Sequence, residues 1–320
     1  MRLLRGDLTS NPNPPAAAVV AIGKFDGLHL GHRAVIDRAA LLAGKQGLPL
    51  TLMSFEPLPH EFFAPASATT RLSRFVSKWH MLEALGTIDT FACLRFNRRS
   101  AAQEAEDFAH RTLAGGLGAR TVVVGEDFRF GRGRKGDVAL LEQAGRISGF
   151  GVEPVAAVCC ADGERISSSR VRRALEENRL DAAAELLGRP YEVWGRVVAG
   201  ERLGRQLGFP TANLALGRRP PPLGGIYIVR ASGLPVGTRY GVANVGTRPS
   251  IGGRRRLLEV YFPEYSGDLY GRLLKVELLA WLRDEAHFAD MDALAQAMGD
   301  DVDNAAQWLR ANGLSWESDR

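Results

Sequence analysis

The sequence predicts an α/β domain with a doubly wound, mostly parallel sheet, followed by a β domain that forms an antiparallel barrel with terminal helices. In the first half, apolar strand-like runs alternate with amphipathic helical runs, which is typical of a parallel sheet covered by helices. After Leu187 the helical signals fade, and short apolar strands recur between turn residues. A chain of 320 residues also favours two domains. We place them at 1–187 and 188–320, because the Gly-Arg-Pro sequence at 188–190 breaks the last helical pattern.

Composition excludes several classes of protein. Apolar residues make up 45% of the chain and charged residues 24%, which is ordinary for a globular protein. No apolar run is long enough to cross a bilayer, and the N-terminal stretch lacks the apolar core of a signal peptide. We therefore expect a cytoplasmic protein that binds no membrane. The three cysteines, Cys93, Cys159 and Cys160, lack CxxC spacing, which favours neither a disulfide framework nor a metal site.

The net charge of +5 is modest, but basic residues cluster at 129–135, 218–219 and 254–256. Solvated loops are the simplest explanation of such clusters. The same pattern also binds anionic nucleotides or nucleic acid, and the charge alone leaves these alternatives open.

The expected elements of the first half follow one another along the chain. The strands are 16–22, 48–55, 88–96, 120–125 and 152–158. The helices between them are 33–44, 73–85, 100–113 and 137–148, with Ser100 as the N-terminal cap of the third. Ligands bind doubly wound sheets at the carboxyl ends of the strands, near the switch in strand order, so a site is expected in the turns that follow the strands.

The turn after the first strand, Gly23 to His32, reads GKFDGLHLGH and leads into a helix. The first amides of a helix have no intrahelical partner and lie at the positive end of its dipole, so they favour an anion. Three glycines allow close approach to the backbone, and two histidines can donate hydrogen bonds to a phosphate. The histidine spacing also fits zinc, but no nearby Cys or carboxylate completes a ligand set. Histidines that merely cap a turn are the structural alternative.

Two later segments could reach the same crevice. Gly125 to Asp137, GEDFRFGRGRKGD, leaves a strand and offers aromatic rings, arginines and flexible turns. Arg165 to Arg172, RISSSRVR, places three hydroxyls before a helix among three arginines. A serine in that position is most often a helix cap. Because the planar fork of arginine suits phosphate oxygens, the segment also predicts contacts with a triphosphate.

From residue 191 onward the spacing favours a compact antiparallel barrel. The expected strands are 191–198, 225–231, 239–245, 257–262 and 273–281. Helical patterns at 290–298 and 302–312 indicate a helical segment that covers the barrel.

This half has its own cluster of candidate site residues. In the PTAN sequence at 210–213, Thr211 and Asn213 alternate along an extended backbone, which places two oxygen ligands on one face, as magnesium requires. A turn held by these two side chains is the structural alternative. Glu259 lies in an apolar strand-like run, where a carboxylate is costly without a task or an ion-pair partner.

Nine motifs stand in a fixed order along nearly the whole chain. Those of the first half are GKFDGLHLGH, FEPLPHEFF, GEDFRFGRGRKGD and ISSSRVR. Those of the second half are GRPY, GFPTANL, GIYIV, GVANVGTRPS and LEVYFPEYSGDLYGR. Together they resemble the bacterial bifunctional riboflavin kinase/FAD synthetases. The resemblance implies an N-terminal nucleotidyltransferase domain of the Rossmann-like, HxGH type, acting on FMN, and a C-terminal riboflavin kinase barrel.

The resemblance also implies roles for residues of the first half. His29 and His32 would hold ATP phosphates, as catalytic residues of adenylyl transfer. The rest of the nucleotide site would comprise Gly23, Phe25, Asp26, Gly27, Asp127, Arg165, Ser168, Ser169 and Arg172. The flavin-side segment is matched by Phe55, Pro57 and Phe62. Lys24 and Ser169 stand where the family more often has Asn and Thr, but neither change removes a phosphate-binding hydroxyl or histidine.

In the kinase half, Glu259 matches the catalytic base. Thr211 and Asn213 match the magnesium and nucleotide ligands, and Gly204 belongs to the kinase nucleotide site. The implied activity is ATP-dependent phosphorylation of riboflavin to FMN, followed by adenylyl transfer from ATP to FMN, which gives FAD and pyrophosphate. Mg²⁺ is the implied cofactor.

The implied partners are the small molecules riboflavin, FMN and ATP, with no nucleic acid, and the chain is expected to be a monomer or a weak homo-oligomer. A single-activity nucleotidyltransferase is one alternative, against which the intact PTAN sequence and Glu259 argue. An RNA-binding flavin sensor, suggested by the basic clusters, is the other.

Overall fold

The computed structural model describes residues 1–6, 17–65, 69–200, 203–217, 219–250 and 253–317. Contacts divide the chain into two compact units. The first unit comprises residues 1–69 and 81–167, and the second comprises residues 70–80 and 168–320.

Within the described residues, the first unit contains a six-stranded, fully parallel sheet in the order β1-β4-β3-β2-β5-β6. The strands are β1 (Arg2–Gly6), β2 (Ala18–Ile22), β3 (Leu50–Glu56), β4 (Thr90–Arg95), β5 (Ala119–Gly125) and β6 (Gly151–Val155). The predicted parallel sheet is confirmed, and β1 is an additional edge strand. The chain builds outward from β2 in one direction through β3 and in the other through β5. The switch point therefore lies between β2 and β5.

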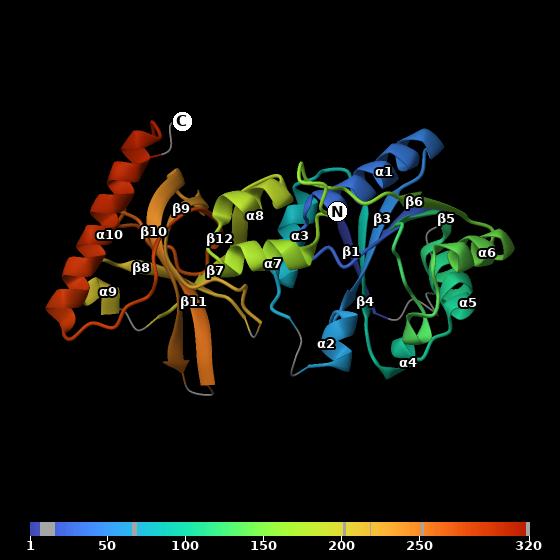
Figure 1. The fold of residues 1–320 in the computed structure, drawn as a ribbon, viewed down its shortest axis with the longest axis horizontal. Coiled ribbons are helices and arrows are strands. Elements are labelled where there is room, and N and C mark those ends of the chain that lie inside the picture. The colour runs from blue at the N-terminus through green and yellow to red at the C-terminus, as the bar shows by residue number, and fades with distance from the viewer. Residues whose placement is uncertain (7–16, 66–68, 201–202, 218, 251–252, 318–320) are drawn as a thin grey trace. The chain divides into compact units, whose positions relative to one another are not determined.

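The helices of this unit follow the strands closely (Figure 1). They are α1 (Leu30–Gln46), α2 (Pro59–Phe63), α4 (Arg98–Ala101), α5 (Ala105–Asp107) and α6 (Val138–Ser148). The long α1 packs against β2, β3 and β5, over strands whose β2 residues are buried throughout. Asp137 caps α6, since its Oδ1 accepts a hydrogen bond from the amide of Leu140 at 3.0 Å.

The prediction that Ser100 caps a helix ending near Leu113 is wrong. Asn97 is the cap, because its Oδ1 accepts hydrogen bonds from the amides of Arg99 and Ser100 at 2.9 and 3.0 Å. Ser100 returns a bond by accepting from the amide of Asn97 at 2.7 Å, which completes a capping box. The chain then forms two short helices and a π-helix over Phe108–Gly116 instead of one continuous helix.

The second unit contains a closed antiparallel barrel, as predicted, in the order β10-β11-β8-β7-β12-β9 within the described residues. Its strands are β7 (Tyr191–Val198), β8 (Thr211–Ala215), β9 (Gly225–Leu234), β10 (Gly237–Ser250), β11 (Gly253–Tyr261) and β12 (Leu273–Arg283). Its helices are α7 (Ser168–Glu176), α8 (Leu180–Leu187), α9 (Leu203–Gln206) and α10 (Met291–Ala311). A further helix, α3 (Phe75–Glu83), begins in this unit and ends in the first.

The helix α10 runs along the outside of the barrel and packs against β10 and β12 (Figure 1). The expected helical segment is confirmed, and the two helical patterns at 290–298 and 302–312 form one continuous helix. Asp290 caps the helix by accepting from the amide of Ala293 at 2.8 Å. The polar stretch near Asp300, which reads as a break in the sequence, lies inside the helix, and Asp301 has an ion-pair partner on the barrel.

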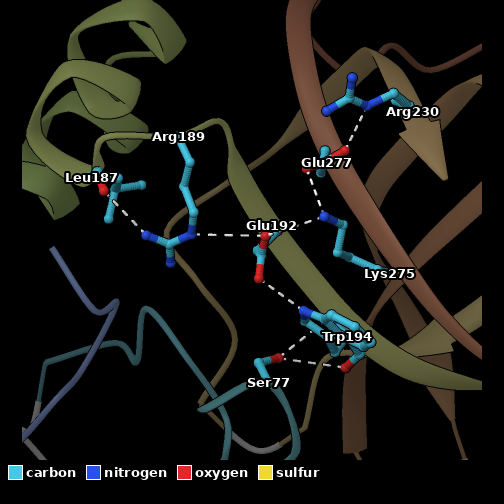
Figure 2. Close-up of polar contacts among 8 residues, drawn as sticks. All are labelled: Ser77, Leu187, Arg189, Glu192, Trp194, Arg230, Lys275 and Glu277. Carbon is cyan, nitrogen blue, oxygen red and sulfur yellow. Dashed lines mark hydrogen bonds and ion pairs between the residues drawn. The ribbon is translucent and has the colours of Figure 1, made fainter. Parts of the chain in front are cut away.

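Charged side chains form a chain of contacts on β7, β9 and β12 (Figure 2). Glu192 lies between Arg189 and Lys275, at 3.7 and 3.8 Å, and accepts a hydrogen bond from Trp194 Nε1 at 2.8 Å. Lys275 continues the contacts to Glu277 at 2.9 Å.

Arg230 lies at 2.6 Å on the other side of Glu277 (Figure 2). Burial pushes the pKa of Glu277 up, but hydrogen bonds from Arg230 and Lys275 outweigh it, so the pKa lies below its ordinary value. The carboxylate therefore stays charged although its side chain is only 8% exposed.

Residues 70–80 group with the barrel because several of their polar groups bond to β7. Ser77 exchanges hydrogen bonds with the backbone of Trp194 (Figure 2), and the Trp194 ring stacks on His80 at 4.8 Å between centroids. Tyr191 donates from its hydroxyl to the Leu72 carbonyl at 2.5 Å. This segment therefore belongs to the same unit as the barrel, although the residues before and after it in the sequence belong to the first unit.

Candidate functional site

A cavity of about 340 Å³ opens in the first unit at the carboxyl ends of β2 and β5, the switch point of the sheet. Of the residues predicted for the adenylyltransferase site, Gly23, Phe25, His29, His32, Phe55, Asp127 and Arg165 line it. The turn after β2 and the loop after β5 thus meet, as the sequence predicts for two turns at one edge of a parallel sheet.

The turn after β2 has an unusual backbone. Phe25 and Leu28 adopt positive φ angles of 48° and 47°, although neither is glycine or asparagine. A non-glycine residue in this region carries a strain cost that the surrounding structure must offset, and such residues cluster at functional sites. Burial supplies the offset here, since Phe25 is fully buried and Leu28 is 2% exposed. Gly23 has no side chain because a Cβ there would lie 2.9 Å from the Phe25 ring.

The two histidines of this turn are held against each other. His29 is the N-terminal cap of α1, and its Nδ1 accepts a hydrogen bond from the amide of His32 at 3.3 Å. Their rings stack with centroids 3.7 Å apart, and Phe25 meets the His32 ring edge-on at 5.5 Å. His29 is only 7% exposed. The pair therefore lies at the positive end of a helix of 17 residues, fixed in orientation and facing the cavity.

Asp127 and Arg165 form an ion pair in the cavity wall, with Arg165 Nη1 donating to Asp127 Oδ2 at 2.7 Å. The hydrogen bond from Arg165 holds the pKa of Asp127 below its ordinary value, and the same bond raises the pKa of Arg165. Both groups are about half exposed, so the pair orients a guanidinium at the cavity more than it stabilises the fold.

Aromatic side chains gather beside this cavity. Phe55 meets Phe96 edge-on at 5.4 Å between centroids, and Phe62 meets the same ring at 5.4 Å. Phe55 lines the cavity, whereas Phe62 contributes to the cluster behind it. Pro57 links the two, after β3 and before α2.

The structure does not bring every predicted residue to the cavity wall. Asp26 is buried beneath the turn, at 2% exposure. Ser168 and Ser169 begin α7 and, with Arg172, belong to the second unit. Arg172 donates from Nε to the carbonyl of Thr70 at 2.6 Å. The lining also includes residues of the predicted turn and of the two later segments that had been given no individual role: Lys24, Phe128, Arg129, Arg134, Ile166 and Ser167.

The basic clusters are partly explained by ion pairs. Arg129 bonds to Asp137 at 3.1 Å and Arg132 bonds to Glu104 at 2.9 Å. Arg218 and the side chains of Arg254 and Arg255 lie outside the described residues.

A second cavity, of about 520 Å³, lies in the second unit between the barrel, α10 and the loop that joins β12 to α10. Its polar end is lined by Gly204, Thr211, Asn244, Glu259 and Tyr261. Its apolar wall comes from Leu207, Phe209, Ile226, Val242, Phe288, Met291, Leu294, Met298 and Val302. The predicted base Glu259 thus lies at one end with Thr211, whereas Asn213 is not part of the lining. The side of the loop and α10 also carries the charged residues Arg283, Glu285, Asp290 and Asp301.

Strand register brings the polar residues together. Glu259 on β11 pairs with Asn213 on β8 and with Asn244 on β10, so the three side chains share one face. Thr211 lies on the same face, two residues before Asn213, and pairs with Tyr261. Glu259 is 9% exposed and Asn213 is 8% exposed. The Oδ1 atom of Asn244 is buried and has no hydrogen-bond partner within the part of the chain that the structure describes.

Gly204, in the short helix α9, has no room for a side chain. A Cβ at Gly204 would lie 2.3 Å from the carbonyl oxygen of Phe209, just before Thr211. The side-chain nitrogen Nδ2 of Asn213 donates to the backbone carbonyl of Thr211 at 3.4 Å. The PTAN stretch is the start of strand β8, and not the side-chain-held turn that was its structural alternative.

Metal ligation by histidine or carboxylate clusters finds no support. No group of three or more His, Cys, Asp or Glu side chains in the described ranges is arranged to hold a metal ion. The zinc alternative for His29 and His32 therefore has no third ligand of this kind among those residues. Oxygen ligands from Thr and Asn, as in the barrel, suit a hard cation that also binds substrate phosphates.

Family models match both halves of the chain. A model described as FAD synthetase matches residues 11–170, and a model described as riboflavin kinase matches residues 187–309. The two matches define an ATP-dependent transferase with two modules, one for each step of flavin coenzyme synthesis. The match to both modules overturns the single-activity alternative.

Curated relatives resemble the chain over almost its whole length. A bifunctional riboflavin kinase/FMN adenylyltransferase of Escherichia coli K12 is 43% identical over 94% of this chain and 96% of the relative. One of Haemophilus influenzae is 39% identical over 97% of this chain and all of the relative. The chain belongs to the family of bifunctional riboflavin kinase/FMN adenylyltransferases. It phosphorylates riboflavin to FMN and adenylylates FMN to FAD, with ATP as co-substrate in both steps.

A solved structure named as a macrolide-efflux protein from Streptococcus pneumoniae has a similar fold, with a TM-score of 0.80 and 27% sequence identity. The match covers 96% of this chain and all of that one. No helix within the described ranges is both long enough and apolar enough to span a membrane.

Proposed function

We propose that the two reactions take place in the two cavities separately, with riboflavin phosphorylation in the barrel and adenylyl transfer at the parallel sheet. The observation that carries this assignment is the buried carboxylate of Glu259, which lines an amphipathic cavity opposite Asn213. The sheet cavity offers histidines, arginines and helix amides, and the carboxylate on its described lining, Asp127, is about half exposed. Each cavity thus has the groups that one of the two reactions needs.

In the barrel, Glu259 is the general base. The 5′-hydroxyl of riboflavin is a poor nucleophile, so a carboxylate that accepts its proton assists the attack on the γ-phosphorus of ATP. The new bond joins the hydroxyl oxygen to phosphorus, and the bond between the β- and γ-phosphates breaks to release ADP. Partial burial of Glu259 keeps water away from the carboxylate and favours proton transfer from the substrate.

The shape of the barrel cavity supports a flavin as the acceptor. Riboflavin has a planar aromatic ring and a polyhydroxyl chain that ends in the reacting hydroxyl. An apolar wall on the side of α10 suits the ring, and the polar end at Glu259 suits the chain. Asn244 adds an acceptor at that end, and a hydroxyl of the substrate chain would satisfy it.

Thr211 and Asn213 would hold Mg²⁺ together with the ATP phosphates. Bound there, the ion would offset negative charge on the transferring phosphoryl group. Gly204 would let the nucleotide lie close to the loop before β8.

At the parallel sheet, no protein nucleophile or base is needed. A phosphate oxygen of FMN attacks the α-phosphorus of ATP, and the bond between the α- and β-phosphates breaks to release pyrophosphate. The protein positions the reactants and stabilises negative charge, through His29, His32 and the amides that begin α1. Arg165 adds a guanidinium held by Asp127. The nucleotide roles of Gly27, Asp26, Ser168, Ser169 and Arg172, and the flavin role of Phe55, Pro57 and Phe62, are part of this proposal.

The module boundary at 187/188 and a monomeric or weakly associating state remain predictions. Because both reactions consume ATP, we place the enzyme in the cytoplasm.

The assignment is tested with Asn213→Leu, which keeps the branching of the side chain but removes its oxygen and nitrogen. We expect loss of FMN formation from riboflavin, ATP and Mg²⁺, while FAD formation from supplied FMN stays at the wild-type rate. Val242→Ala, a wall residue of the same cavity without polar groups, is the matched control and should alter riboflavin affinity more than turnover. Equal loss of both activities in Asn213→Leu would refute separate sites.

A further inference from the structure

An ion pair between Arg283 and Asp301 stands in the wall of the barrel cavity. Arg283 is the last residue of β12, and Asp301 lies midway along α10. Nε of the arginine donates to Oδ1 and Nη2 donates to Oδ2, both at 2.7 Å. Two parallel bonds between planar groups fix orientation as well as distance, and the Asp301 side chain is only 6% exposed. The pair is therefore a rigid joint between barrel and helix.

Arg283 also reaches the loop that joins β12 to α10. Its Nη1 donates to the carbonyl of Asp284 at 3.0 Å. Its guanidinium carbon lies 5.8 Å from the centre of the Phe288 ring, within the range of a cation–π contact. Phe288 lines the cavity, as do Arg283 and Asp301 themselves. One arginine thus holds a strand end, a loop and a helix around the same hollow.

The two halves of α10 are held in different ways. In the second half, Ala305 and Leu309 are buried against apolar residues of β9 and β10. In the first half, Met291, Leu294 and Met298 line the cavity. A helical segment that faces a hollow gains little packing to fix its position. The ion pair stands at the junction of the two halves, where it can hold the first half in place.

We propose that Asp301 is a positioning residue for the flavin ring. Through Arg283, it fixes Phe288 and the first half of α10 as the wall against which the ring stacks. The inference rests on the assignment of riboflavin phosphorylation to the barrel cavity. Because the pair lies on the ring side and Glu259 on the chain side, its loss weakens flavin binding and leaves the phosphoryl-transfer step and ATP affinity unchanged.

The first test is Asp301→Asn in the full chain, which keeps the shape of the side chain and removes its charge. We expect the KM for riboflavin to rise about tenfold, the size of one lost charge-assisted hydrogen bond, with kcat within about twofold of wild type. The KM for ATP and the rate of FAD formation from supplied FMN stay unchanged. A fall in kcat without a rise in the riboflavin KM would overturn the proposal.

Glu317→Gln is the matched control. Glu317 pairs with Arg239 at 3.0 Å and also ties the end of the chain to the barrel, but neither residue lines the cavity. This variant should keep wild-type KM values. If Asp301→Asn does not fold, Arg283→Lys keeps the positive charge but loses the planar fork, and the same rise in the riboflavin KM is expected.

A flavin that carries a methyl group in place of the ribityl chain measures how much the ring alone contributes to binding. As a competitive inhibitor of FMN formation, it should lose about tenfold in affinity for Asp301→Asn, in parallel with riboflavin. An unchanged inhibition constant beside a raised riboflavin KM would overturn the role at the ring.

Glu259→Gln distinguishes a failure of the cavity assignment from a failure of the positioning role of Asp301. If that variant forms FMN at the wild-type rate, the cavity assignment itself fails. If its FMN formation falls and Asp301→Asn matches wild type in both the KM and the inhibition constant, only the positioning role fails.

Discussion

The two cavities of this chain obtain their polar groups in opposite ways. At the parallel sheet, the groups come from turns that follow strands: the cap of α1 after β2, and the loop after β5. In the barrel, they come from the strands themselves, where register sets Glu259 between Asn213 and Asn244. The first cavity depends on local backbone geometry, such as the positive φ angles of Phe25 and Leu28. The second depends on the pairing of strands that are distant in sequence.

This difference matches the chemistry of the two steps. Adenylyl transfer needs donors aimed at phosphates, and turns expose backbone amides that closed ladders do not. Phosphorylation of an alcohol needs a base held in a dry site, and the face of a buried strand provides one. Four predictions test this contrast, ordered by the size of the expected effect on activity.

Glu259→Gln should lower FMN formation about a thousandfold, within the range of general-base contributions, because the amide cannot accept the substrate proton. FAD formation from supplied FMN should not change. The measurement is the initial rate of each product in separate assays. Glu259→Asp, which keeps the carboxylate but shortens its reach, should recover part of the kinase rate. A Gln variant with normal FMN formation would show that Glu259 is not the general base.

His29→Ala should lower adenylyl transfer about a hundredfold, comparable to the loss of one donor that stabilises developing charge. The variant also removes the cap of α1 and the stack with His32. FMN formation should stay at the wild-type rate. This result is the converse of the one expected for Glu259→Gln, where only FMN formation falls. His29→Asn, which can still cap the helix, distinguishes capping from phosphate contact. Full activity in the Asn variant would reduce His29 to a structural cap.

Asp127→Asn should raise the KM for ATP in adenylyl transfer about fivefold, since an exposed ion pair contributes roughly 1 kcal/mol. Because Arg165 lowers the pKa of Asp127, the pair is intact at and above the ordinary pKa and is lost only as pH falls through the lowered value. The difference in KM between wild type and variant should therefore be constant from about pH 5 to pH 8. A lower KM in the variant would show that Asp127 competes with ATP for Arg165.

Glu277→Gln should change neither activity and should destabilise the barrel by about 2 kcal/mol at neutral pH, since it leaves two cations beside a buried neutral group. The folded pKa of Glu277 lies below 4.5, so its contribution is present above pH 4.5 and is lost as pH falls through the lowered value. The difference in free energy of unfolding between wild type and variant should therefore become smaller below pH 4.5. All five tryptophans, at 79, 194, 281, 308 and 316, belong to the second unit, so their fluorescence follows its unfolding. A difference in free energy of unfolding that grows at low pH would contradict a lowered pKa for Glu277.

Local patterns predicted the elements and most of the sheet cavity. The strand 191–198 has the bounds that the sequence predicts, and Asp137 begins a helix as expected. His29, Asp127 and Arg165 meet because turns at one edge of a parallel sheet must be neighbours. The cap predicted at Ser100 was wrong because Asn97, three residues earlier, is also a good capping residue and takes that role.

Non-local features could not be predicted in the same way. The sequence marks Glu259 and Asn213 separately, but their pairing depends on a register between β8 and β11. The wall of the barrel cavity comes from α10 and from Arg283, which carry no motif that was recognised. Residues 70–80 fall within the stretch that the FAD synthetase model matches, yet they pack with the barrel through Trp194. Such a placement depends on tertiary hydrogen bonds and leaves no periodic signal.

The most direct measurement mixes two variants, each defective in one cavity. Glu259→Gln alone should make FAD from riboflavin only about a thousandfold more slowly than wild type, and His29→Ala alone should accumulate FMN. An equimolar mixture with riboflavin, ATP and Mg²⁺ should make FAD, since FMN formed in the barrel of one chain is adenylylated at the sheet of another. A mixture that forms FMN but no FAD, although the Glu259→Gln chain converts supplied FMN, would contradict independent cavities that exchange FMN.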